Sequence, residues 1–285
     1  MPDSAILIPR QSADGFRNMA VDEYLLELCR AGRVGAALRF YEWEPPAVSL
    51  GYSQSFDLMD LAACAEQGID VVRRITGGGA LLHWQELTYC FVLRRGAAAG
   101  GRWPRETAGA VSQSLVQGLS RLGVQASARR RTRGTADRAG PDPAAPGLCF
   151  MSGAENEIEA SGRKLAGCAH KSTREAFFSH GSVMTGSGHV HVARLVRANT
   201  PPSSAGLALS MAEKSISLSE LLGEVPGAEE MESAFRTAFE SVLGLRFRPD
   251  SLSAAGARLV EERAAQKRSV LAAAVQGAQM TGGAR

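Results

Sequence analysis

The stretch Arg73-Arg74-Ile75-Thr76-Gly77-Gly78-Gly79-Ala80 follows a β-branched run and places three consecutive glycines after two arginines. Without side chains in the way, the backbone N–H groups of such a segment can converge on an anion or a carbonyl oxygen. A flexible turn is the commoner explanation of such a triplet, and the flanking arginines strengthen the anion interpretation. Arg73, Arg74, Gly77, Gly78 and Gly79 are therefore candidate substrate-binding residues.

A second segment, Gly162-Arg163-Lys164-Leu165-Ala166-Gly167, places a lysine in β-rich sequence. Because successive strand side chains point to opposite faces, we expect Lys164 to point inward if Arg163 points to solvent. A buried ammonium group needs an anionic partner or a chemical role, since burying it alone is costly. A solvated surface lysine is the alternative.

The third segment is Gly147-Leu148-Cys149-Phe150-Met151, directly before a strand-like run. A cysteine thiolate is a strong nucleophile, whereas a cysteine without such a role is usually a small buried hydrophobe. The chain has five cysteines and no CxxC pair, which predicts neither a metal site nor a disulfide framework and indicates a reducing compartment.

Composition excludes several classes of protein. Hydrophobic residues at 45% and charged residues at 21% are typical of a globular chain, and a net charge of +3 is too small to indicate nucleic-acid binding. The N-terminus has no secretory pattern, and no uncharged apolar run approaches the ~20 residues that cross a bilayer. We expect a cytoplasmic monomer with no membrane or nucleic-acid partner.

The hydrophobic patterns predict helices and strands that do not alternate in a regular βαβ order. Helices are expected over 18–29, 57–67, 107–122 and 228–243, and strands over 37–43, 47–50, 69–75, 87–93, 155–160, 163–169 and 176–184. The expected fold class is therefore α+β, with mixed or antiparallel sheets and packed helices.

Three segments lack a periodic apolar face. Residues 126–147 are rich in arginine and proline and predict a mobile surface loop, and residues 199–210 predict a Pro/Ser linker. The final fifteen residues predict a frayed tail. We accordingly expect a catalytic domain over 1–250, followed by a C-terminal helix and tail over 251–285.

Taken together, the motifs resemble the lipoate/octanoate transferase and ligase superfamily, which shares its catalytic fold with biotin protein ligases. The likeness spans most of residues 15–190. Its segments are Asn18 to Glu23, similar to the N-terminal helix motif; 38–43 with 45–52, similar to the first hairpin; 73–79 with His83 and 86–89, similar to the acyl-pocket loop; and 162–164 with His180-Gly181-Ser182, similar to the catalytic-lysine strand and its neighbour.

The resemblance implies further roles in the site. Gly167 would line it from the lysine strand, and Gly78, Gly79, Ala80 and Leu81 would form one wall of the acyl slot. His83 would hydrogen-bond at the carrier entrance or serve a structural purpose. His180 would orient the site.

Within the superfamily, the chain is similar to the cysteine–lysine octanoyltransferases. Cys149 stands fifteen residues before Lys164 and is followed by Phe150, as in that group. The resemblance implies transfer of an octanoyl group from acyl carrier protein, through a Cys149 thioester, to a lysine of a lipoyl-domain protein such as the glycine cleavage H protein. Lys164 would stabilise the thiolate and the developing oxyanion, and no cofactor or metal is required.

The sequence departs from that group at several positions. Gly79 stands where an arginine is usual, and Trp84 stands where an acid is usual. Asn156-Glu157-Ile158 is closer to the Asn-Asp-Ile segment of ATP-dependent lipoate ligases, where the acid helps to hold magnesium. A ligase and a non-catalytic acyl-carrier-binding protein therefore stay open as alternatives. The arginine run 129–133 would either steer acidic carriers toward Cys149 or be a solvated loop.

Overall fold

The computed structural model describes residues 4–97, 103–129, 147–149, 157–197 and 203–282, with side chains described as far as residue 277. Its strands form an eight-stranded sheet in the order β11-β1-β2-β6-β10-β9-β8-β7 and a three-stranded sheet in the order β4-β3-β5. The strands are β1 (Ala5–Ala13), β2 (Ala36–Trp43), β3 (Ala47–Leu50), β4 (Asp70–Arg73), β5 (Leu81–His83), β6 (Glu86–Arg94), β7 (Ser127–Ala128), β8 (Ile158–Ala160), β9 (Arg163–Ser172), β10 (Ala176–Met184) and β11 (Phe247–Pro249).

Both sheets mix parallel and antiparallel pairs. In the large sheet β1 is parallel to β2 and β11, whereas β2, β6, β10, β9 and β8 pair antiparallel in succession. In the small sheet β3 is parallel to β4 and antiparallel to β5. The prediction of an α+β fold with mixed sheets is confirmed.

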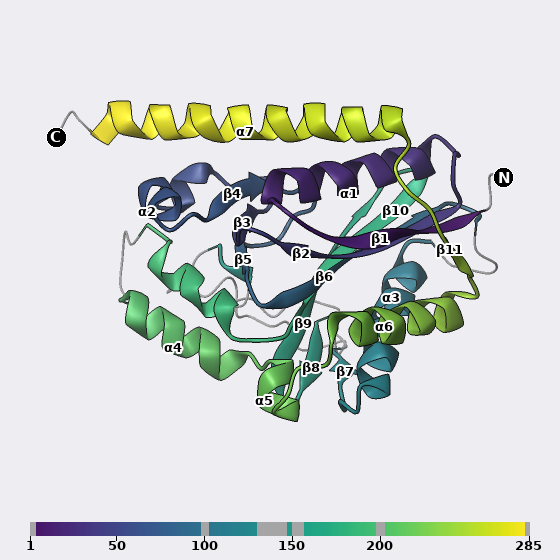
Figure 1. The fold of residues 1–285 in the computed structure, drawn as a ribbon. Coiled ribbons are helices and arrows are strands. Elements are labelled where there is room, and N and C mark those ends of the chain that lie inside the picture. Colours follow the sequence, from purple (N-terminus) through teal and green to yellow (C-terminus); the bar gives the residue numbers. More distant parts are fainter. Residues whose placement is uncertain (1–3, 98–102, 130–146, 150–156, 198–202, 283–285) are drawn as a thin grey trace.

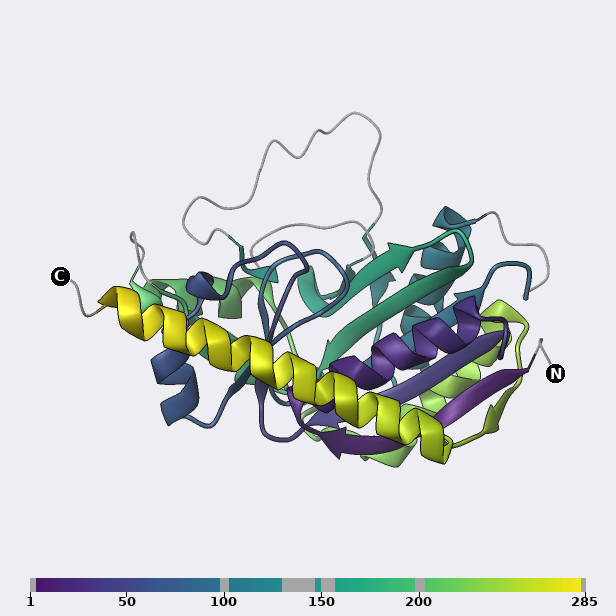
Figure 2. The ribbon, with the colours of Figure 1, turned by 90° about the horizontal axis from the view of Figure 1, so that it is seen from above.

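Helices cover both faces of the large sheet (Figures 1 and 2). The helices are α1 (Gly15–Arg30), α2 (Leu61–Glu66), α3 (Arg105–Arg121), α4 (Ser204–Lys214), α5 (Leu218–Leu222), α6 (Ala228–Leu243) and α7 (Ala254–Gly282), with short 3-10 helices η1 (Phe56–Leu58) and η3 (Gly188–Arg194). Helices α3 and α6 pack on one face of the large sheet, and α1 and α7 lie over the other.

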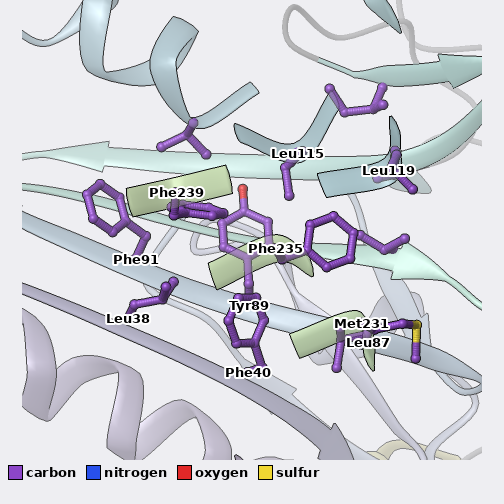
Figure 3. Packing of buried hydrophobic residues seen from close by; sticks show 14 of the residues in the cluster. Leu38, Phe40, Leu87, Tyr89, Phe91, Leu115, Leu119, Met231, Phe235 and Phe239 are labelled. Atoms are coloured by element: carbon purple, nitrogen blue, oxygen red, sulfur yellow. The ribbon is translucent and has the colours of Figure 1, made fainter. Parts of the chain in front are cut away.

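The core beneath α3 and α6 is rich in aromatic side chains (Figure 3). Phe239 of α6 lies between rings of the sheet, with ring centroids 5.5 Å from Phe91, 5.7 Å from Tyr89 and 6.5 Å from Phe40. Burying a side chain of this size stabilises the fold by roughly 1.5–3 kcal/mol. This core fixes the large sheet, which carries one wall of the site.

The small sheet forms a third core with α2, α4 and η3, and α7 links it to the rest of the molecule. Leu271 of α7 packs against both this core and the core beneath α1. Arg263 and Lys267 of the same helix form ion pairs with Glu27 and Glu23 of α1. Helix α7 therefore holds the two sheets together.

Several expectations for individual segments were wrong. The segment expected to be a linker contains the start of α4, capped by Ser203, and the segment expected to be a frayed tail is helical as far as Gly282. The surface loop expected over 126–147 includes strand β7, which pairs with β8; residues 130–146 lie outside the described chain. The expected first hairpin is not one, because β2 and β3 belong to different sheets.

No helix in the described ranges is long and apolar enough to cross a membrane.

Candidate active site

A β-bulge near the start of β9 sets the direction of the Lys164 side chain. The pairing of β8 with β9 leaves Leu165 as an extra residue on β9. In a regular strand Lys164 and Gly167 would lie on opposite faces, because they are three residues apart. The extra residue changes the alternation of side chains along β9. As a result, Lys164 and Gly167 line the same cavity, and Leu165 packs into the core beneath α3.

Lys164 is 6% exposed, whereas Arg163 reaches the surface and forms an ion pair with Glu220. Lys164 therefore points inward and Arg163 outward, and the alternative of a solvated surface lysine is wrong. The Lys164 Nζ atom donates to Glu157 Oε1 at 2.6 Å and lies 3.8 Å from Cys149 Sγ. Burial alone would lower the pKa of Lys164, but the neighbouring Cys149 and Glu157 raise it overall, so the side chain carries a positive charge.

The glycine-rich segment holds Cys149 in place through backbone pairing. Ala80 N donates to Gly147 O at 2.6 Å, and Cys149 N donates to Ala80 O at 3.0 Å. A Cβ atom on Gly79 would lie 2.6 Å from Cys149 N and from the carbonyl carbon of Leu148, both backbone atoms. Only glycine at position 79 allows the Cys149 backbone to approach this closely.

Arg74 holds residues 77–79 of the same segment in place through hydrogen bonds to their backbone. Its Nη2 atom donates to the carbonyl oxygens of Gly77 and Gly79, both at 2.8 Å, and its Nη1 atom donates to Ser49 O at 2.8 Å. The side chain is only 5% exposed. Arg74 therefore uses its donors to shape the glycine segment and tie it to β3.

A buried polar network lies behind His180. Its Nε2 atom is 2.7 Å from Thr76 Oγ1, and its Nδ1 atom is 3.3 Å from Asp22 Oδ2. Asp22 also accepts from Tyr41 at 2.9 Å and forms an ion pair with Arg39. Burial lowers the pKa of His180 more than Asp22 raises it, so the imidazole is neutral at physiological pH. This network, which includes the buried Thr76, orients His180 at the cavity wall.

A second network holds His83. Glu86 Oε1 accepts from His83 Nδ1 at 2.7 Å and from the Ser182 hydroxyl at 2.6 Å, while His83 Nε2 lies 2.7 Å from Ser49 Oγ. The imidazole stacks on Trp43 at a centroid distance of 3.9 Å. Burial alone would raise the pKa of Glu86, but His83 and the bonded hydroxyl groups lower it, so Glu86 is a carboxylate.

These residues enclose a cavity of about 90 Å³ between the two sheets. Of the predicted site residues, all but Arg73 and Gly77 line it. Arg73 instead lies at the surface beside Tyr52, and Trp84 is 41% exposed. The lining residues are Met19, Tyr41, Trp43, Ser49, Arg74, Gly78, Gly79, Leu81, His83, Thr88, Cys149, Glu157, Lys164, Gly167, Cys168, Ala169, His180, Gly181 and Ser182.

The other four cysteines are poor nucleophiles. Burial raises the pKa of Cys168 to about 11, that of Cys29 and Cys64 to about 12, and that of Cys90 well above its usual value. Because the thiolate is the reactive form, these thiols are unreactive at neutral pH. Cys168 also lies near the ammonium group of Lys164, but burial raises its pKa more than this charge lowers it. The Sγ atom of Cys149 is 3.8 Å from Lys164 Nζ.

The arrangement combines a thiol, an adjacent buried cation and a largely apolar cavity, which suits acyl transfer through a covalent thioester. Within the described ranges, no group of three or more His, Cys, Asp or Glu side chains is placed to hold a metal ion. Glu157, the carboxylate that the ligase alternative would assign to magnesium, is bonded to Lys164.

Sequence reasoning missed several residues of the site. The sequence indicated Glu157 only through its likeness to the lipoate ligases. The carboxylates Asp22 and Glu86 lie within segments that carry the family resemblance, but no role followed for either from the sequence. Asn18 and Asp22 are four residues apart and therefore lie on one side of α1, which is the feature of the sequence that could have indicated Asp22. The structure shows that both side chains are buried. A polar pair on the buried side of a helix indicates a functional or structural network.

Comparison with known proteins gives likenesses over most of the chain. Residues 14–240 match the family described as lipoyl protein ligase A/B catalytic domain. The octanoyltransferase LipM of Symbiobacterium thermophilum is 36% identical, covering 84% of this chain and 86% of that protein. The LipM proteins of Geobacillus kaustophilus and Kyrpidia tusciae are 31% and 34% identical, covering 88% and 83% of this chain and 90% and 86% of those proteins.

Two solved structures have a similar fold. The bi-partite lipoate protein ligase of Thermoplasma acidophilum, described with its E2 lipoyl domain, superposes with a TM-score of 0.74 at 20% identity, covering 93% of this chain and 94% of that one. A lipoate-protein ligase A bound with ATP gives 0.72 at 20% identity, covering 93% and 96%. At this identity the likeness concerns the fold alone.

Proposed function

The chain belongs to the lipoyl protein ligase A/B catalytic domain family and is an octanoyltransferase of protein lipoylation, and we propose that it acts through a Cys149 thioester. The donor is an octanoylated acyl carrier protein, and the acceptor is a lysine of a lipoyl-domain protein such as the glycine cleavage H protein. The observation that carries this proposal is the 3.8 Å separation of Cys149 Sγ and Lys164 Nζ within one cavity.

In the first step, the Cys149 thiolate attacks the carbonyl carbon of the donor thioester. The new bond joins Cys149 Sγ to the octanoyl carbon, and the bond to the carrier sulfur breaks, so the carrier leaves as a thiol after taking the proton that the Cys149 thiol gave up when it formed the thiolate. The ammonium group of Lys164 stabilises the thiolate and the negative charge that develops on the carbonyl oxygen. Glu157 keeps that ammonium group in position.

In the second step, the amine of the acceptor lysine attacks the acyl-enzyme. An amide bond forms, the Cys149 thioester breaks, and one proton from the amine returns to the thiol. Atoms and charges balance over the two steps without a nucleotide.

The cavity provides an apolar place for the acyl chain. Met19, Tyr41 and Trp43 line it from the large-sheet side, and Leu81 lines it from the small sheet. Each buried CH₂ group contributes about 0.8 kcal/mol, so a slot of this kind favours an eight-carbon chain over a much shorter one by several kcal/mol.

The proposal is tested by intact-protein mass spectrometry after mixing with octanoyl carrier protein in the absence of ATP. The expected result is a mass gain of one octanoyl group, which moves to an apo lipoyl domain when that domain is added. The gain is expected to be absent in Cys149→Ser and present in Cys168→Ser, the matched control for the other cysteine that lines the cavity.

Other results would overturn the proposal. Modification of the lipoyl domain only with free octanoate and Mg-ATP would identify a ligase in which Cys149 takes no part. Binding of the acylated carrier without any transfer would identify a carrier-binding protein.

A further inference from the structure

An exposed tyrosine lies between two cations at the outer side of the glycine-rich segment. Tyr52 is 64% exposed, the highest value among the large hydrophobic side chains of the described ranges. Arg73 Nη1 donates to Tyr52 O at 3.0 Å, and Lys171 Nζ lies 5.4 Å from the centre of the Tyr52 ring. We refer to Tyr52, Arg73 and Lys171 as the rim patch.

The rim patch is held rigidly. The Arg73 guanidinium lies 5.0 Å from the centre of the Phe56 ring, and Lys171 Nζ donates to Ile75 O at 3.4 Å. Tyr52 N donates to Thr76 O at 2.8 Å. Anchored aromatic and cationic side chains lose little conformational entropy on binding, which is typical of interface hot spots.

The patch is also connected to the segment that carries Cys149. Gln54, two residues after Tyr52, donates from Nε2 to Gly147 O at 2.8 Å, and its Oε1 atom accepts from Gly51 N at 2.9 Å. The loop that carries Tyr52 therefore contacts both segments that close the cavity on this side, 74–79 and 147–149.

The charge of the patch is not neutralised within the described part of the chain. Neither Arg73 nor Lys171 has a carboxylate within ion-pair distance there, whereas Arg163 and Arg129 near the other end of β9 pair with Glu220 and Glu159. Asp57, in the neighbouring η1, accepts a hydrogen bond from Ser55 and forms no ion pair with Arg73 or Lys171 in the described part of the chain. The rim patch therefore presents a net positive surface with an aromatic centre.

We infer that the rim patch is the docking surface for the donor, an acidic carrier protein whose phosphate-bearing arm delivers the thioester to Cys149. The inference rests on the proposed function. Positive charge at the rim speeds encounter with an acidic partner and holds it in one orientation.

Distance favours the donor over the acceptor. Lys171 and Lys164 are seven residues apart on β9, and with the extra residue of the bulge discounted this corresponds to a backbone separation of roughly 20 Å at about 3.3 Å per residue. A carrier with a long flexible arm can rest on the rim patch while its thioester reaches Cys149. The acceptor offers only a lysine side chain, so its domain must approach directly above Cys149.

The experiment compares two donors on the same enzyme: octanoyl carrier protein, and the small thioester octanoyl-N-acetylcysteamine, which has neither carrier nor phosphate. Acylation of Cys149 is followed by mass spectrometry in the variants Lys171→Glu and Tyr52→Ser and in their double variant. The control is Arg248→Glu. Arg248 is exposed and lies on β11, the edge strand of the large sheet that is separated from β9 by four strands.

For the carrier, we expect KM to rise about tenfold in Lys171→Glu and further in the double variant, with kcat little changed. Raising the salt concentration from about 0.05 M to about 0.5 M should raise KM for the carrier in the wild type and much less in Lys171→Glu, because salt screens the charges. The small thioester should acylate all variants at the wild-type rate, which also shows that they are folded.

An unchanged KM for the carrier in these variants would overturn the inference while leaving the proposed function intact. A rise in KM for the lipoyl acceptor alone would assign the patch to the acceptor instead. Failure of both donors to acylate the wild-type enzyme would contradict the proposed function itself.

Discussion

Lys164 Nζ lies 2.6 Å from Glu157 Oε1, and both side chains are buried at the wall of the cavity that contains Cys149. The carboxylate directs the ammonium group, whose Nζ atom is 3.8 Å from Cys149 Sγ. A buried ion pair is a weak source of net stability, because desolvation offsets most of the attraction. In the proposed mechanism, its value is to keep a positive charge beside Cys149, the proposed nucleophile.

Replacing Glu157 by glutamine should weaken that charge. Without the carboxylate, burial of Lys164 lowers its pKa with less opposition, so the ammonium form is lost at a lower pH. We expect Glu157→Gln to slow acylation of Cys149 about tenfold or more and to move the alkaline limb of its pH profile downward. Glu159→Gln, a partly exposed acid on β8, is the control. An unshifted profile with a normal rate would show that Glu157 has no part in acylation.

Removing Lys164 tests its role, provided that the fold is protected. Lys164→Ala alone removes the 2.6 Å partner of the buried Glu157 and leaves it only the more distant Arg129, at 3.9 Å; breaking a buried ion pair in this way costs roughly 3–5 kcal/mol. In the double variant Lys164→Met with Glu157→Gln, no charge is left unpaired, and we expect near-wild-type thermal stability with acylation reduced by two or more orders of magnitude. Stopped acylation assays with octanoyl-N-acetylcysteamine and a melting curve provide the readouts. Rapid acylation of this folded double variant would remove Lys164 from the mechanism.

Local sequence predicted much of the fold, because most elements carry their own periodic pattern. The helix predicted over 228–243 and the strand predicted over 176–184 have the observed bounds of α6 and β10. The segment expected to be a linker and the one expected to be a tail were wrong because α4 and α7 depend on tertiary packing. Their sequences are rich in alanine, glycine and serine, which give a weak amphipathic signal.

The site was predictable only in part, for a similar reason. Cys149, Lys164 and the glycine segment lie in short motifs that can be read locally. The partners of His180 and Lys164 depend on the fold: Asp22 is 158 residues from His180, and the bulge at Leu165 appears only when β8 and β9 are paired. Arg74 lines the cavity, and its expected role in binding substrate stays a prediction. Its hydrogen bonds to the glycine segment depend on the fold and could not be predicted from the local sequence.

The close approach of Gly79 to Cys149 predicts a strong effect of a single methyl group. A Cβ atom at position 79 would lie 2.6 Å from backbone atoms that have little freedom to move. We expect Gly79→Ala to destabilise the fold by about 1–3 kcal/mol and to slow acylation, because Cys149 is displaced from Lys164. At Gly77 an added Cβ meets no atom of the described residues within 4 Å, so Gly77→Ala should melt close to the wild type. Equal melting temperatures for the two variants would contradict the close packing at Gly79.

His170 predicts a loss of stability in mild acid. Its ring lies 5.4 Å from that of Phe177, and neither of its nitrogen atoms has a hydrogen-bond partner in the described part of the chain. Burial, with a smaller effect of His180, lowers its pKa from 6.5 to about 4. The unfolded chain therefore binds a proton near pH 6.5 that the folded chain resists until about pH 4. The stability from the neutral ring is present above pH 6.5 and is lost as the pH falls toward 4.

At 1.36 kcal/mol per pKa unit, a shift from 6.5 to about 4 limits this loss to about 3–4 kcal/mol. We expect the urea midpoint of the wild type to fall between pH 7 and pH 4.5, and to fall less in both His170→Phe and His170→Leu. The two replacements differ in size and shape, so a change that they share reports the lost proton rather than altered packing. His189, whose pKa burial also lowers to about 4, should preserve part of the pH dependence in each variant. If both variants lost stability as steeply as the wild type, protonation of His170 would not be the cause.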